Sequence, residues 1–308
     1  MVNEVNHRKN NMVNEVNPGK NRQTMEVHEP IKRDRNLNIT VIADDSRVGR
    51  VAVDHGVMLA EVFQASLTVM ANFGFGFGLP ESRHVPDDSS YLKEIRDMVS
   101  ETKNSQVVTD YIFPETLFKY AEEHNTAMFV IGVAYFLEDR AECFFTLKKA
   151  LKFIRQSRFP VMTVTAYLES VTDYKNILLT LDIERQNKEK ALWAGYFSRF
   201  YGSVIHILYP KYKDEGLVKL VRDNLDFVEK LYDNLEISYD KYQVPSQSHL
   251  DAYALTDTHE SGALVIMMTR YYTLADVLTG PRERKIIGKT AMPVLCINQR
   301  DDLYVLCT

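Results

Sequence analysis

The most constraining feature of the sequence is a segment that occurs twice. A basic stretch with apolar residues at helical spacing runs into Pro-Val and a short apolar strand, first in LKKALKFIRQSRFPVMTVT (147–165) and again in LTGPRERKIIGKTAMPVLCIN (278–298). The prolines of the two copies, Pro160 and Pro293, stand 133 positions apart. In a chain of 308 residues, a length typical of two domains, this spacing indicates one α/β unit used twice.

Strand-like and helix-like segments alternate through both halves. Continuous apolar runs indicate buried parallel strands, and apolar residues at three- and four-residue spacing indicate helices. In the first half we expect strands at 37–44, 66–73, 106–113, 126–133 and 161–165, and helices at 48–63, 91–103, 115–123 and 144–156. In the second half we expect strands at 176–182, 203–209, 235–244, 263–268 and 294–298, and helices at 188–200, 215–232, 249–258 and 283–289.

This alternation predicts an α/β fold of two doubly wound, five-stranded parallel-sheet domains in tandem. We expect the first domain at 37–168, the second at 173–300, and a C-terminal tail at 301–308. Residues 1–36 contain a literal repeat, MVNEVNHRKNN followed by MVNEVNPGKNR, with few large apolar side chains. Because such a segment cannot offset its ordering entropy by burial, we expect a disordered N-terminal tail, with a partner-binding arm as the alternative.

Charge and cysteine content narrow the function classes. A net charge of −5 and a pI near 5.9 provide no overall positive field to recruit nucleic acid. The three cysteines are scattered, which argues against a metal site or a disulfide framework and favours free thiols in a reducing cytoplasm. No apolar run approaches the roughly 18–20 residues that span a bilayer. We therefore expect a cytoplasmic protein that binds no metal, membrane or nucleic acid.

Candidate site residues follow from the predicted strand ends. In doubly wound sheets, ligands bind beyond the carboxyl ends of the strands, where the strand order reverses. Asp44 and Asp182 follow the first strand of each half, with Ser46 two residues after Asp44, and Gly132 lies near the end of the fourth strand of the first half. Each aspartate has two interpretations: contact with a ligand, or acceptance of hydrogen bonds from backbone amides at a helix N-terminus.

These residues resemble a tandem universal stress protein, with two domains of the UspA family in one chain. The resemblance covers about 37–300 and rests on Asp44-Asp45-Ser46, the fourth strands FVIG and VIMM, the strand openings Phe159-Pro160-Val161 and Met292-Pro293-Val294, and Gly280 before the last basic helix. It implies two Rossmann-like, HUP-type domains whose last strands pair across a dimer interface. In one chain this implies an intramolecular pseudo-dimer, which leaves room for a homodimer of whole chains, with interface residues Val161, Thr163, Val294 and Cys296.

The family's nucleotide motif is broken in both halves. Nucleotide-binding members carry Gly, two residues, Gly, nine residues, then Gly-Ser or Gly-Thr, which brings amides and a hydroxyl to the phosphates. In the first half Gly132 matches, Tyr135 replaces the second glycine, and the Gly-Ser pair falls at about Leu147-Lys148. In the second half Met268 and Tyr271 replace the first two glycines, and Gly280 is followed by Pro281, which has no amide hydrogen. The resemblance therefore implies no ATP cofactor bound in the usual manner.

Other features have structural interpretations beside functional ones. FGFGFG (73–78) lacks the Lys-Ser/Thr of a phosphate loop and fits a flexible loop, with an interaction patch or ligand lid as the alternative. The histidines show no metal-ligating spacing. The basic runs in 148–152 and 282–285 are typical of solvated helix faces, and the alternative is attraction of an anion or an acidic partner.

Two hypotheses follow. The first is a non-catalytic, cytoplasmic stress-response or regulatory protein that binds an unidentified protein partner or a small ligand and has degenerate ATP-binding motifs. The second is a nucleotide-binding sensor for ATP or AMP, or a slow ATPase, which uses an altered pocket around Asp182 and Gly280.

Overall fold

The structure is a computed structural model of the chain. It describes residues 37–71, 88–109, 114–134, 143–165, 173–183, 187–247, 262–268, 281–290 and 292–298. The predicted tails at 1–36 and 301–308, the predicted helix at 249–258 and the FGFGFG stretch lie outside these residues.

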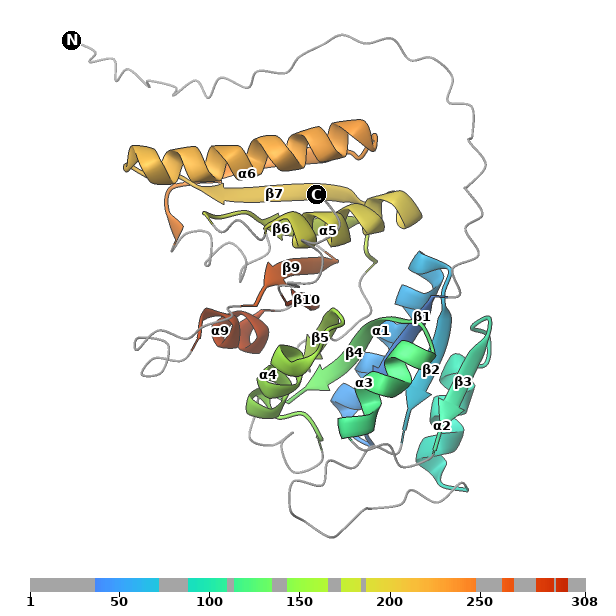
Figure 1. The fold of residues 1–308 in the computed structure, drawn as a ribbon. Coiled ribbons are helices and arrows are strands. Elements are labelled where there is room, and N and C mark those ends of the chain that lie inside the picture. The colour runs from blue at the N-terminus through green and yellow to red at the C-terminus, as the bar shows by residue number, and fades with distance from the viewer. Residues whose placement is uncertain are drawn as a thin grey trace, which may run out of the picture. The chain divides into compact units, whose positions relative to one another are not determined.

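Ten strands of the described residues form one sheet in the order β3-β2-β1-β4-β5-β10-β9-β6-β7-β8 (Figure 1). The strands of the first half are β1 (Asn38–Ile42), β2 (Ser66–Met70), β3 (Ser105–Val108), β4 (Thr126–Val133) and β5 (Val161–Thr165). Those of the second half are β6 (Asn176–Thr180), β7 (Val204–Pro210), β8 (Tyr239–Val244), β9 (Ala263–Met267) and β10 (Val294–Ile297). Each half thus repeats one strand order, which confirms the predicted doubly wound α/β fold.

The two five-stranded sets meet at a single antiparallel pair. β5 and β10 run antiparallel, whereas the other neighbouring strands of the sheet are parallel. In this pair Val294 lies opposite Thr163 and Cys296 lies opposite Val161. The pairing covers two strand edges that would otherwise present open backbone groups.

Helices cover both faces of the sheet. One core cluster packs α1 (Arg47–Phe63), α2 (Ser90–Val99), α5 (Asn187–Tyr201) and α6 (Glu215–Asn234) against one face. A second cluster packs α3 (Pro114–Glu123), α4 (Leu147–Gln156) and α9 (Arg282–Lys289) against the other. Strand residues alternate between the clusters, as Val130 and Ile131 of β4 do, because successive side chains of a strand point to opposite faces.

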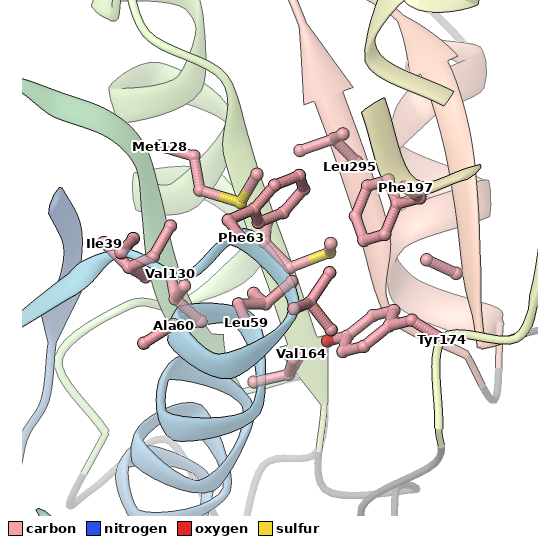
Figure 2. Packing of buried hydrophobic residues seen from close by; sticks show 14 of the residues in the cluster. Ile39, Leu59, Ala60, Phe63, Met128, Val130, Val164, Tyr174, Phe197 and Leu295 are labelled. Carbon is pink, nitrogen blue, oxygen red and sulfur yellow. The ribbon is translucent and has the colours of Figure 1, made fainter. Parts of the chain in front are cut away.

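The first cluster continues across the antiparallel seam. Figure 2 shows Phe63 of α1 beside Phe197 of α5, and the centroids of these two rings are 4.9 Å apart. His55 of α1 reaches Tyr174, which precedes β6, with 2.7 Å between the histidine Nδ1 and the tyrosine hydroxyl. The two halves therefore share buried contacts as well as a sheet. The division into domains at 37–168 and 173–300 stays a prediction.

Several predicted element boundaries are wrong by three or more residues. The helix expected at 144–156 begins at Leu147, and the strand expected at 106–113 ends at Val108. The strand expected from Leu235 begins at Tyr239, because α6 continues to Asn234 and Glu236 adopts a left-handed backbone with φ 54°. The helix expected at 91–103 ends at Val99, and a turn leads to Asn104, which has φ 55°. Before β8 the apolar alternation of Leu235 and Ile237 extends past the chain reversal, whereas the apolar residues of α2 end at Val99 and the polar residues 100–103 lead into the turn.

Candidate functional site

The strand order places both candidate aspartates at equivalent positions. In each half the first and fourth strands are neighbours: β1 lies beside β4, and β6 lies beside β9. The second and third strands lie on one side of the first strand, and the fourth lies on its other side, so the strand order reverses at this point. Asp44 lies just beyond β1 and Asp182 just beyond β6. These are the positions at which doubly wound sheets bind ligands.

In the first half, both carboxylate oxygens of Asp44 accept hydrogen bonds from the chain itself. Its Oδ1 accepts from the amide of Ser46 at 3.2 Å and from the Ser46 hydroxyl. Its Oδ2 accepts from the backbone amide of Phe144. Asp44 therefore ties the segment before α4 to the start of α1, as the structural interpretation of this residue expects.

Ser46 caps helix α1. Its hydroxyl oxygen accepts from the amide of Gly49 at 3.0 Å, and the side chain is buried. A Cβ at Gly49 would lie 2.2 Å from the carbonyl oxygen of Asp44, so only glycine allows α1 to begin this close to the strand end. The hydroxyl thus completes an N-cap within the chain.

Gly132 and Cys143 fill the space beside this helix start. A Cβ at Gly132 would lie 2.5 Å from the carbonyl oxygen of Val48, which gives this glycine a packing role.

The Cys143 thiol lies 3.8 Å from the carbonyl oxygen of Gly132 and 3.6 Å from that of Phe145, and it donates weakly to both. Burial, with the nearby Asp44 carboxylate second, raises the pKa of the Cys143 thiol to about 12. The thiol stays protonated at neutral pH and is no nucleophile.

One sequence assignment in this half needs correction. The Gly-Ser position was expected at about Leu147-Lys148, but α4 begins at Leu147 and its N-cap is Thr146. The Thr146 hydroxyl accepts from the amide of Lys149 at 3.5 Å. A hydroxyl therefore does stand at this helix N-terminus. The spacing of the motif could have found it, because the nine residues after Tyr135 end at Phe144 and the pair then falls at Phe145-Thr146.

In the second half, Asp182 pairs with a cation. Its Oδ2 lies 3.5 Å from a guanidinium nitrogen of Arg282, the first residue of α9, and its side chain is 9% exposed. Asn224 of α6 donates to the backbone carbonyl of Asp182 at 2.8 Å. When the side-chain amide of Gln247 is oriented with its oxygen toward α9, this oxygen accepts hydrogen bonds from the two terminal guanidinium nitrogens of Arg282, at 3.2 and 2.8 Å. Arg282 is thus held between Asp182 and Gln247.

A small cavity lies beside this pair. Its volume is about 20 Å³, enough for about one water molecule. The N-cap of α9 is Pro281, which makes no side-chain capping bond and has no amide hydrogen. The cavity is lined by Thr180, Asp182, Lys190, Ile266, Met267, Arg282, Glu283 and Ile286.

Two residues of this site were missed at the level of sequence. Lys190 of α5 and Glu283 of α9 each have 2% of their surface exposed. Together with Asp182 and Arg282 they give the cavity wall two cations and two carboxylates, a balanced set that lowers the cost of burying charge. The available signal for Lys190 was its place one turn before Ala194 and two turns before Phe197 on the buried stripe of α5.

The four interface candidates lie in the antiparallel pair. Val161, Thr163, Val294 and Cys296 are all buried. The hydroxyl of Thr163 donates to the carbonyl oxygen of Val294 at 3.2 Å, and burial raises the pKa of the Cys296 thiol.

The remaining candidates lie outside the described residues. These are Gly280, Tyr135 and Tyr271. Within the described ranges there is no group of three or more His, Cys, Asp or Glu residues arranged to hold a metal ion. The same ranges contain no helix long and apolar enough to cross a membrane.

Comparison with known proteins identifies the fold. No protein-family model matches the chain, and no curated protein matches it in sequence. Among solved structures, it is similar to a universal stress protein from Archaeoglobus fulgidus DSM 4304, with 11% identity, a TM-score of 0.61, and coverage of 86% of this chain and 100% of that one. It is also similar to a functionally unknown protein from Pseudomonas aeruginosa PAO1, with 12% identity, a TM-score of 0.59, and coverage of 88% and 94%. The chain thus has a universal-stress-protein-like fold.

Proposed function

We propose that this chain is a non-catalytic, universal-stress-protein-like regulatory protein that acts by binding a partner and does not turn over a nucleotide. The observation that carries the proposal is the Asp182–Arg282 pair, 3.5 Å apart at the carboxyl end of β6. The site's own guanidinium engages the carboxylate that a ligand would contact.

The first half supports the same proposal. Asp44 directs one oxygen to Ser46 and the other to the amide of Phe144, so both carboxylate oxygens already accept hydrogen bonds within the chain. Gly132 has a packing role against Val48. The residues that survive from the nucleotide motif therefore have structural duties here.

Among the described residues, the N-cap position of α9 contributes no donor for a phosphate. A phosphate at a helix N-terminus is bound by free backbone amides, commonly assisted by a hydroxyl. At the start of α9, Pro281 supplies neither group. Within the described residues, the cavity beside Asp182 holds about one water molecule and is many times smaller than a nucleotide.

The alternative function is a nucleotide-binding sensor or slow ATPase in the second half. It is favoured by one observation: Lys190 and Arg282 bring two cations to the wall of the cavity beside Asp182. If Arg282 moved away from Asp182, both cations could face a phosphate. Under this alternative, ATP or AMP is the ligand and Asp182 is needed for its binding.

The arrangement of the halves completes the proposal. The antiparallel β5–β10 pair and the Phe63–Phe197 contact support an intramolecular pseudo-dimer of two domains. We propose a cytoplasmic location, in keeping with cysteines that are free and buried in the described residues.

Calorimetry and mass spectrometry test the proposal. Wild type should bind no Mg-ATP or AMP at micromolar concentration, and native mass spectra of gently purified protein should show no stoichiometric nucleotide. Arg282→Ala is the informative variant, since it opens the space beside Asp182. Micromolar binding by wild type that Asp182→Ala abolishes would establish the sensor instead.

A further inference from the structure

Two basic helices lie next to each other over the seam of the sheet. α4 and α9 pack against each other on the face that carries the second core cluster, above β5 and β10. Both can be located beside these strands in Figure 1. Asn298 follows β10, and its side-chain amide donates to the carbonyl oxygen of Ile154 and, at 2.8 Å, to that of Ser157. These hydrogen bonds tie the C-terminal end of α4 to the second half.

These two helices carry a large excess of positive charge. Residues 147–158 and 282–289 contain nine Lys and Arg residues and one acidic residue, Glu283, which is buried. Their formal charge is +8 in a chain of net charge −5, so the remaining residues sum to −13. Apart from Arg282, which pairs with Asp182, the exposed or half-exposed cations are called here the cationic face: Lys148, Lys149, Lys152, Arg155, Arg158, Arg284, Lys285 and Lys289.

Helical spacing aligns these cations. Lys148, Lys152 and Arg155 are separated by four and three residues on α4, and Lys285 and Lys289 by four on α9, so each set shares one side of its helix. The α4 row is about 10 Å long at 1.5 Å per residue. Arg158 lies 3.8 Å from a carboxylate oxygen of Glu122, in an exposed pair of the kind that contributes little.

We infer that the cationic face is a docking surface for an acidic protein segment, one rich in Asp and Glu. Charge complementarity carries the inference, because a short acidic segment meets the +8 region without approaching the acidic remainder of the chain. The inference is independent of nucleotide binding, since it uses neither Asp44 nor Asp182.

The same helices fit other polyanions less well. A long nucleic acid would extend from the cationic face over a remainder of charge −13, and the only aromatic residue of the two helices, Phe153, is buried and cannot stack on bases. A membrane-binding helix needs exposed apolar residues. The large apolar residues of both helices, Leu147, Leu151, Phe153, Ile154, Ile286 and Ile287, are buried.

Fluorescence anisotropy with a labelled decamer of glutamate tests the inference. At about 50 mM NaCl the wild-type chain should bind the decamer, and binding should weaken as salt rises because the charges are exposed. The variant Lys148→Glu/Lys285→Glu should bind about tenfold more weakly. The matched control is Lys219→Glu/Lys230→Glu on the exposed side of α6, which changes net charge equally and should stay within about twofold of wild type.

Three results would overturn the inference: no binding of the decamer, equal weakening in both double variants, or tighter binding to a single-stranded DNA 20-mer or to vesicles containing phosphatidylserine. Circular dichroism should show the same thermal unfolding for both variants, because all four lysines are exposed. The milder Lys148→Gln/Lys285→Gln should weaken decamer binding in the same direction, so the test does not depend on one pair of substitutions.

Discussion

Lowering the pH should weaken this fold through one buried histidine, His55. Its side chain is fully buried in α1, and its Nδ1 lies 2.7 Å from the hydroxyl of Tyr174 in the other half of the chain. Its Nε2 has no hydrogen-bond partner among the described residues. Burial lowers the pKa of His55 from 6.5 to about 4, because the charged imidazolium would lose its hydration.

The sign and size of the effect follow from linkage. Between pH 6.5 and pH 4 the unfolded chain binds a proton at this residue that the folded chain does not. The contribution of neutral His55 is therefore complete above pH 6.5 and is lost as the pH falls toward 4. The loss should be about 2 kcal/mol at pH 5 and about 3 kcal/mol at pH 4.

Urea denaturation at pH 7 and pH 5 measures this difference. His55→Asn keeps a polar group near the Tyr174 hydroxyl but does not titrate in this range, so its stability should fall by about 2 kcal/mol less than that of wild type between the two pH values. His124→Gln, an exposed substitution at the end of α3, should keep the wild-type pH dependence. Equal pH dependence in wild type and His55→Asn would refute the reasoning, as would an NMR titration that gives His55 a pKa near 6.5.

Two further substitutions test the packing of the first-half site. Gly132→Ala places a methyl group against the backbone of Val48 and should destabilise the fold by about 1–3 kcal/mol in urea denaturation. Gly195→Ala, whose added methyl would meet the end of the Ile237 side chain at 3.1 Å and the Tyr232 ring at an ordinary 3.4 Å, should change stability by less than about 1 kcal/mol, and an equal effect of the two would contradict the packing argument. Ser46→Ala should cost about 1 kcal/mol through loss of the α1 cap, with Ser100→Ala as a near-neutral control in the same measurement.

Sequence periodicity predicted the elements well where burial alone decides them. β4 and β5 have the predicted limits, because TAMFVIGV and VMTVT are buried almost throughout. The limits of α2 and β8 could not be predicted as well. Before β8 the left-handed Glu236 reverses the chain while the apolar alternation continues, and after α2 the polar residues 100–103 lead to the left-handed Asn104.

The candidate site was predictable in position but not in its contacts. Parallel-sheet topology places Asp44 and Asp182 at the strand ends, whatever their side chains do. Their partners are remote: Phe144 lies 100 residues from Asp44, and Arg282 lies on α9, 100 residues from Asp182. Lys190 and Glu283 also escaped prediction, because a buried charge looks like a solvated one until its neighbours are known.

Calorimetry with Mg-ATP on the full chain tests the central claim most directly. Both candidate carboxylates are engaged by the chain itself, Asp44 by Phe144 and Asp182 by Arg282, so the account predicts no binding at micromolar concentration. Stoichiometric binding at micromolar concentration that Asp182→Ala removes would contradict it.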